Sequence, residues 1–184
     1  MATDSGNDYG EEGILDAFQT MNLKFISYDP AEHDLFFNSI QQFSSSIINF
    51  CASTPRPMDM KFTSSVAKHL QRNSKLFVMI YELDSRLIGI WPTTEIGILK
   101  EYQGQEAEAV EWALNWAFNS AGLHRVEMDV PSWNMRLGEV CEEMGFQTEG
   151  TRKECLFKDG KWWDEVSMAI LEKDWKEGHI KMEK

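Results

Sequence analysis

Residues 94–121 read TEIGILKEYQGQEAEAVEWALNWAFNSA and carry the strongest structural pattern in the chain. The opening run, residues 94–99, predicts a strand because threonine and isoleucine favour extended backbone. A helix is predicted over residues 105–121, where apolar side chains recur at three- and four-residue spacing: Ala109, Trp112, Ala113, Trp116 and Ala117. Gly122 ends that helix, as glycine commonly does. The centre of the chain is therefore a strand, a glycine-containing loop and a helix.

Around this centre, the apolar patterns predict alternating strands and helices. Further strands are predicted at residues 23–28, 75–81, 86–91, 124–130, 146–157 and 162–171, and further helices at 30–43, 59–73 and 135–144. In the first of these helices, Leu35, Phe36 and Ile40 form the apolar side. The order predicts an α+β fold, a single mixed central sheet flanked by helices. We expect an acidic flexible N-terminus at 1–20, one domain at 21–175 and a charged tail at 176–184.

Composition narrows the partners that the 184-residue chain can take. Its formal net charge is −12, which argues against general nucleic-acid binding, because that needs a cationic face. The acidity fits a cationic partner, or it serves solubility alone. Three cysteines without ligand spacing suggest free thiols and no metal site. With no secretory signal and no apolar run long enough for a bilayer, we expect a cytoplasmic protein without membrane contact.

Short motifs follow one another in a fixed order through the C-terminal half: EIGI at 95–98, EYQG at 101–104, EA at 108–109, GLHRVE at 122–127, WN at 133–134, GF at 145–146 and DGK at 159–161. This series resembles the GNAT superfamily of acyl-CoA N-acyltransferases, in the branch of ribosomal-protein and polyamine acetyltransferases. The resemblance runs from about Glu95 to Trp175. It implies a GNAT-like fold, acetyl-CoA as acyl donor, and direct acetyl transfer to a polyamine, peptide or small-molecule amine.

The resemblance also implies where the donor binds. The strand backbone at Ile96, Gly97, Ile98 and Leu99 would pair with the pantetheine arm, and Asn134 would contact the same arm. The loop residues Gln103, Gly104 and Gln105 would offer backbone N–H groups to the pyrophosphate. Unsatisfied amides at a helix N-terminus and the helix dipole both favour an anion there.

Two residues are implied to take part in the reaction. Glu95 matches an acidic position of the family and would remove a proton from the amine, directly or through a water. It could instead be an ordinary glutamate at a strand edge. Cys141 stands where the family often has the tyrosine that protonates the leaving thiolate. A thiol can serve as that acid, or it can be a small buried apolar residue. The helix cap that Asn134 would provide explains that residue without a ligand.

The sequence departs from the family at the loop. Glu106 replaces the second glycine, Glu108 follows it, and the loop is shortened. Two carboxylates would repel a pyrophosphate, or they are ordinary first-turn acids that the helix dipole favours. The alternative function is accordingly a catalytically impaired GNAT-fold binding protein. The hairpin turn at 158–161 could also support a homodimer contact.

Overall fold

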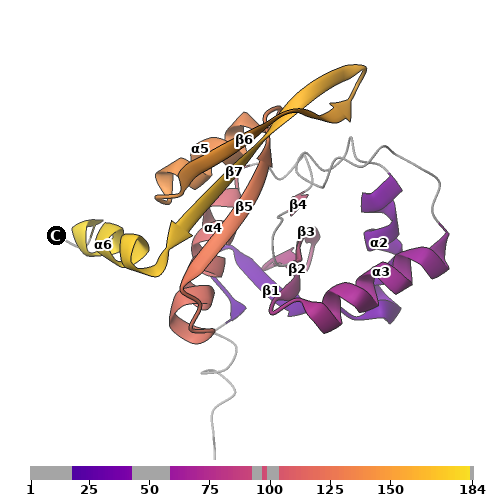
Figure 1. The fold of residues 1–184 in the computed structure, drawn as a ribbon. Coiled ribbons are helices and arrows are strands. Elements are labelled where there is room, and N and C mark those ends of the chain that lie inside the picture. The colour runs from indigo at the N-terminus through magenta and orange to yellow at the C-terminus, as the bar shows by residue number, and fades with distance from the viewer. Residues whose placement is uncertain (1–17, 43–58, 93–96, 99–103, 183–184) are drawn as a thin grey trace, which may run out of the picture.

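The computed structural model describes residues 18–42, 59–92, 97–98 and 104–182, and the structural statements below concern these residues (Figure 1). The elements in chain order are β1 (Leu23–Ser27), α2 (Pro30–Gln42), α3 (Met60–Asn73), β2 (Phe77–Glu82), β3 (Leu87–Pro92), β4 (Gly97–Ile98), α4 (Glu106–Asn115), the π-helical turn η3 (Trp116–Ser120), β5 (Arg125–Pro131), α5 (Met135–Glu143), β6 (Gln147–Lys158), β7 (Lys161–Leu171) and α6 (Glu172–Met182). The predicted α+β class is confirmed.

The strands form two antiparallel sheets, ordered β1-β2-β3-β4 and β5-β7-β6. This differs from the single mixed sheet expected from the sequence. Within the described ranges β4 comprises only Gly97 and Ile98, which pair with Ile90 and Gly89 of β3. Strand β5 pairs with β7 over its whole length. No ladder of hydrogen bonds among these residues joins β4 to β5, and the strands therefore divide into two groups.

Helices cover both faces of the first sheet, as the alternating side chains of β2 show. Val78 and Ile80 belong to the larger core cluster, which includes Val110 and Leu114 of α4. Phe77 and Met79 belong to a second cluster with Phe37 of α2 and Ala67 of α3. Successive side chains of a strand point to opposite faces, so α4 covers one face and α2 with α3 cover the other. Figure 1 shows α2 and α3 together on one side of the molecule.

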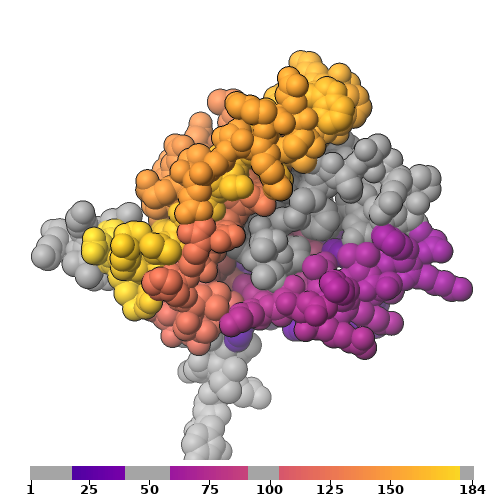
Figure 2. Space-filling view, viewed as in Figure 1, coloured from indigo at the N-terminus to yellow at the C-terminus, as the bar shows by residue number. Residues whose placement is uncertain are grey.

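The larger core cluster joins the two halves. Besides α4 and the first sheet, it contains Met128 of β5, Val140 of α5 and Ile170 of β7. Helix α4 thereby packs against both sheets. Figure 2 shows the long β6–β7 hairpin extending away from this core.

The predicted helices are present, but their buried sides differ in detail. In α2, Phe37 and His33 are buried, whereas Leu35 is 77% exposed, so its assignment to the apolar side was wrong. A helix turns by about 100° per residue, and a shift of two positions moves a side chain to the opposite face. Helix α3 begins at Met60, one residue after the predicted start, and the side chain of Asp59 caps it by accepting from the N–H of Phe62 at 2.7 Å.

Two helix boundaries also differ from the expectation. The predicted helix over 105–121 becomes π-helical at Trp116, where the N–H of Ala121 donates to the carbonyl of Trp116 at 2.9 Å. The expected charged tail at 176–184 is helical as far as Met182, within α6. Trp175 holds this helix against the body, because its buried ring lies 5.4 Å from that of Phe118. None of the helices in the described ranges has both the length and the apolar composition needed to cross a membrane.

Candidate functional site

The predicted donor site lies where β4 leads into α4. Glu95, Ile96, Leu99 and Gln103 fall outside the described residues. Gly97 and Ile98 form the described part of β4. Gly104 precedes α4 with φ = +111°, a conformation that side-chain-bearing residues rarely adopt. No described atom lies within 4 Å of a Cβ built at Gly104, so its backbone conformation, rather than lack of space, requires glycine.

The N-terminus of α4 has features that suit the binding of a phosphate and of a ligand N–H group. Gln105 occupies the N-cap position, and within the described ranges its side chain makes no capping bond to the helix. Its Nε2 instead donates to Glu82 Oε1 at 2.8 Å. Its Oε1 is buried and has no hydrogen-bond partner among the residues that the structure describes. The uncapped helix start fits a phosphate, and the orphaned oxygen fits an N–H of a bound arm.

Glu106 does not fit a bound pyrophosphate. Its side chain is only 3% exposed, and its Oε2 accepts a hydrogen bond from the backbone N–H of Gly104 at 2.6 Å. This N–H is one that the predicted loop would offer to the cofactor. The protein's own carboxylate therefore occupies part of the anion-binding position at the start of α4.

Glu108, the second acid of this turn, points elsewhere. Its two oxygens accept from the backbone N–H and from Nδ2 of Asn22, at 2.8 and 2.9 Å. Burial alone would raise the pKa of Glu108, but hydrogen bonds from Thr20 and Asn22 outweigh it and lower the pKa. Glu108 thus ties the start of β1 to α4, a role that its spacing from Glu106 could not reveal.

Asn134 and Cys141 both lie in the core beside β5. Asn134 is buried and caps α5 as predicted, accepting from the N–H of Leu137 at 3.3 Å. Cys141 is 0% exposed, and its thiol donates to Met128 Sδ at 3.5 Å. Burial, with a smaller contribution from the charge of Glu142, raises the pKa of Cys141 to about 12. These surroundings are those of a packing residue, and its role as general acid remains a prediction.

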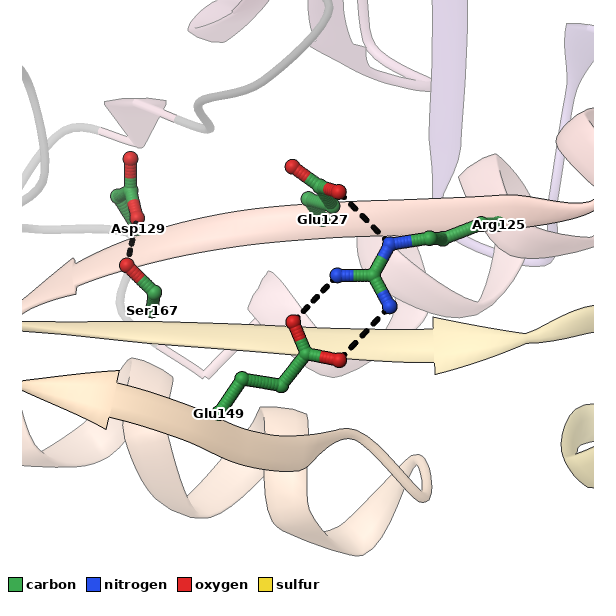
Figure 3. A network of polar contacts seen from close by, with 5 residues as sticks. All are labelled: Arg125, Glu127, Asp129, Glu149 and Ser167. Carbon is green, nitrogen blue, oxygen red and sulfur yellow. Dashed lines mark hydrogen bonds and ion pairs between the residues drawn. The ribbon is translucent and has the colours of Figure 1, made fainter.

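An ionic network covers one face of the second sheet (Figure 3). Arg125 binds Glu127 on its own strand and Glu149 on β6, each at 2.7 Å. Further along the face, Ser167 of β7 donates to Asp129 at 2.7 Å. Arg125 is shared by two carboxylates, which leaves this cluster with a net negative charge. The alternating charged positions 125, 127 and 129 in the predicted strand were the available signal, but only the sheet shows which carboxylate on β6 joins them.

A separate apolar cavity of about 240 Å³ lies between α4, the start of β2 and β5, lined among others by Leu76, Val110, Ala117 and Val126. None of the predicted site residues that the structure describes lines it. Across the described residues, no three histidine, cysteine, aspartate or glutamate side chains gather as a metal site would require.

Known N-acetyltransferases are similar to part of the chain in sequence. No protein-family model matches the chain. An uncharacterized N-acetyltransferase of Bacillus subtilis is 36% identical over 87 residues, which are 45% of this chain and 51% of that protein. The ribosomal protein uS5-alanine N-acetyltransferase of Escherichia coli is 31% identical over 83 residues, 45% of this chain and 43% of the enzyme. The chain spans about half the length of these curated relatives.

The similarity in fold extends further than the similarity in sequence. The spermidine N-acetyltransferase of Vibrio cholerae, in complex with CoA and spermine, has a TM-score of 0.69 at 21% identity and covers 85% of this chain and 99% of its own. The chain thus has the fold of the GNAT acyl-CoA N-acyltransferases, and the resemblance in its sequence is confirmed. More particularly, its structural neighbours are spermidine N-acetyltransferases.

Proposed function

We propose that this chain is an acetyl-CoA-dependent N-acetyltransferase that transfers the acetyl group directly to an amine. The observation that carries the proposal is the sequence identity to N-acetyltransferases in a chain with the same fold. The positive φ of Gly104 at the start of α4 supports it, because such a backbone lets a phosphate approach closely. We assign the reaction to a domain at residues 21–175, preceded by an acidic segment at 1–20.

Some of the predicted site residues are proposed to bind the donor, and others to transfer protons. Acetyl-CoA supplies the activated acyl group as a thioester. The backbone at Ile96, Gly97, Ile98 and Leu99 holds the pantetheine arm together with Asn134, and Gln103, Gly104 and Gln105 hold the pyrophosphate. Glu95 removes the proton from the amine, since only the neutral form has a lone pair for attack on the carbonyl. Cys141 is the candidate donor of a proton to the thiolate.

For the acceptor, we propose a cationic amine such as a polyamine or a basic peptide. The net charge of −12 supports this, as does the acidic network around Arg125 and Asp129. A structural neighbour was solved in complex with spermine. Another neighbour is dodecameric, and we also propose that this chain self-associates, as a homodimer, through the β6–β7 hairpin. We place the protein in the cytoplasm, because Cys141 and Cys155 are free thiols.

Calorimetry with acetyl-CoA, followed by an acetylation assay with spermidine and a lysine-rich peptide, tests the proposal. We expect saturable binding and release of free CoA that requires the amine. The loss of a positive charge on acetylation also gives a product that mass spectrometry and chromatography resolve. If acetyl-CoA at millimolar concentration neither binds nor reacts, the transferase proposal is wrong.

A second candidate is a GNAT-fold binding protein without catalysis, which the position of Glu106 favours. Replacing residues 103–108 with a glycine-rich loop separates the two. A transferase already acetylates the amine before this change, whereas a degenerate protein acquires donor binding and turnover that the parent lacks. Acetyl transfer by the parent would exclude the binding-protein alternative.

A further inference from the structure

We infer that Glu106 is a built-in competitor for the donor's pyrophosphate and thereby sets the affinity of this chain for CoA. The carboxylate occupies the anion-binding position at the N-terminus of α4 until a ligand displaces it. The inference deepens the proposed function, on which it rests for the identity of the donor. It makes Glu106 a specificity-determining residue that discriminates among thioester donors by the negative charge they carry.

Glu106 accepts a hydrogen bond from the backbone of Gly104. A backbone N–H has one hydrogen, and that of Gly104 is donated to Glu106 Oε2 at 2.6 Å. A phosphate oxygen that needs the same N–H must first replace the carboxylate.

Glu106 is also buried. A carboxylate that is 97% removed from solvent by residue area needs compensating interactions, and here they come from the Gly104 N–H and the positive end of the α4 dipole. These are the two interactions that would otherwise stabilise a bound phosphate. Glu106 therefore uses the physical features that make a helix start an anion site.

Glu106 differs in its partners from Glu108, the other acid of the same turn. Both Glu108 oxygens are engaged by Asn22, on the side of α4 that faces the start of β1. Gln105 offers no alternative competitor, because its side chain is neutral and bonds Glu82. Of the first-turn acids of α4, Glu106 alone is directed back to the loop.

Binding of three probes to four proteins tests the inference. The probes are CoA, pantetheine (which lacks the pyrophosphate) and inorganic pyrophosphate. The proteins are the wild type, Glu106→Gln, Glu106→Ala and the matched control Glu108→Gln, which removes one negative charge from the same turn. Glu106→Gln keeps an oxygen acceptor for Gly104, so it should fold, and a thermal melt of each protein verifies this.

We expect CoA to bind about tenfold or more tightly to Glu106→Ala than to the wild type, with Glu106→Gln in between, because a like charge and a competing acceptor are removed. Pantetheine should bind the Glu106 variants and the wild type equally, and Glu108→Gln should match the wild type with CoA. Unchanged CoA affinity in both Glu106 variants, or an equal gain in Glu108→Gln, overturns the inference.

The measurements with inorganic pyrophosphate test the role of Glu106 independently of the proposed function. If neither CoA nor pantetheine binds any of the proteins, the transferase proposal fails. Glu106 is then still tested, because inorganic pyrophosphate should raise the melting temperature of Glu106→Ala and leave that of the wild type in place. Equal responses of the two proteins to pyrophosphate would show that Glu106 does not guard an anion site.

Discussion

The carboxylate of Glu108, in the first turn of α4, bridges the backbone N–H and the side-chain Nδ2 of Asn22, at the start of β1. The two residues are 86 positions apart in the sequence, so this contact fastens the N-terminal strand to the central helix. We expect Glu108→Gln to lower the free energy of unfolding by about 1 kcal/mol, as for a partly exposed charged hydrogen bond. Chemical denaturation measures the change, and Glu111→Gln on the exposed side of α4 is the control.

The same contact gives the fold a dependence on acid. The folded-state pKa of Glu108 is lowered from its ordinary value of 4.5, so its contribution is present above that pH and is lost as the pH falls through the lower folded value. The wild type should therefore lose more stability than Glu108→Gln on acidification below about pH 4.5. Parallel thermal melts of the two proteins over this range should converge. A constant difference down to the lowest pH would contradict the assignment.

Cys141 offers a test of catalysis against packing. Because its thiol is buried against Met128, we expect Cys141→Ala to reduce the free energy of unfolding by about 1–2 kcal/mol through the cavity it leaves. The rate of acetyl transfer at saturating substrate should stay within about twofold if the thiol only packs, but should fall about 10²-fold if it is the general acid. Cys141→Ser, which keeps a proton donor of similar size, separates these readings: rescue of the rate by serine would support catalysis.

The buried thiol also predicts a loss of stability in alkali. The pKa of Cys141 is raised by burial from 9.0 to about 12, so an unfolded chain releases this proton before the folded one does. The contribution to stability is complete below about pH 9 and declines as the pH rises toward 12. Cys141→Ala should be less sensitive than the wild type to pH over this window in chemical denaturation. Identical slopes for both proteins would show that the thiol ionises freely in the folded state.

Glu95 is the predicted base, and its replacement should affect chemistry rather than donor binding. Glu95→Gln should lower kcat at neutral pH by about 10²-fold, the usual contribution of a general base. The affinity for acetyl-CoA should remain within about twofold, because the proposed contacts of this strand with the donor are made by its backbone. Steady-state kinetics and calorimetry measure the two quantities separately. An unchanged kcat would assign Glu95 to a structural role at the strand edge.

His33 and Tyr81 allow a prediction about the face of the first sheet that α2 and α3 cover. Nδ1 of the buried His33 accepts from the N–H of Asp29 at 2.7 Å, so a neutral ring carries its proton on Nε2 and donates it to the Tyr81 hydroxyl at 2.8 Å. Tyr81→Phe should cost about 1–2 kcal/mol by leaving that donor unpaired. The same substitution in a His33→Leu background should cost less, and a double-mutant cycle measures the difference. Equal costs in both backgrounds would refute the coupling.

Local patterns predicted most elements and several of their ends. Asn134 caps a helix where its side chain was expected to do so, because a cap depends on residues within one turn. The sequence did not predict correctly which side of α2 is buried. His33 and Phe37 are buried, whereas Leu35 is exposed. A short helix with apolar residues on several sides does not specify by periodicity alone which side the sheet covers. The π-helical turn at Trp116 left no recognisable mark in the sequence either.

Residue order and residue type were enough to predict the α+β class, the resemblance to N-acyltransferases and the departure at Glu106 and Glu108. These properties rest on the order of motifs and on residue types, both of which are local. The folded chain was needed to show that the two acids of one turn point in opposite directions, Glu108 toward Asn22 and Glu106 toward the N–H of Gly104. A side chain takes its direction from the partners within its reach, and the partner of Glu108 is distant in the sequence and comes close only when β1 packs beside α4.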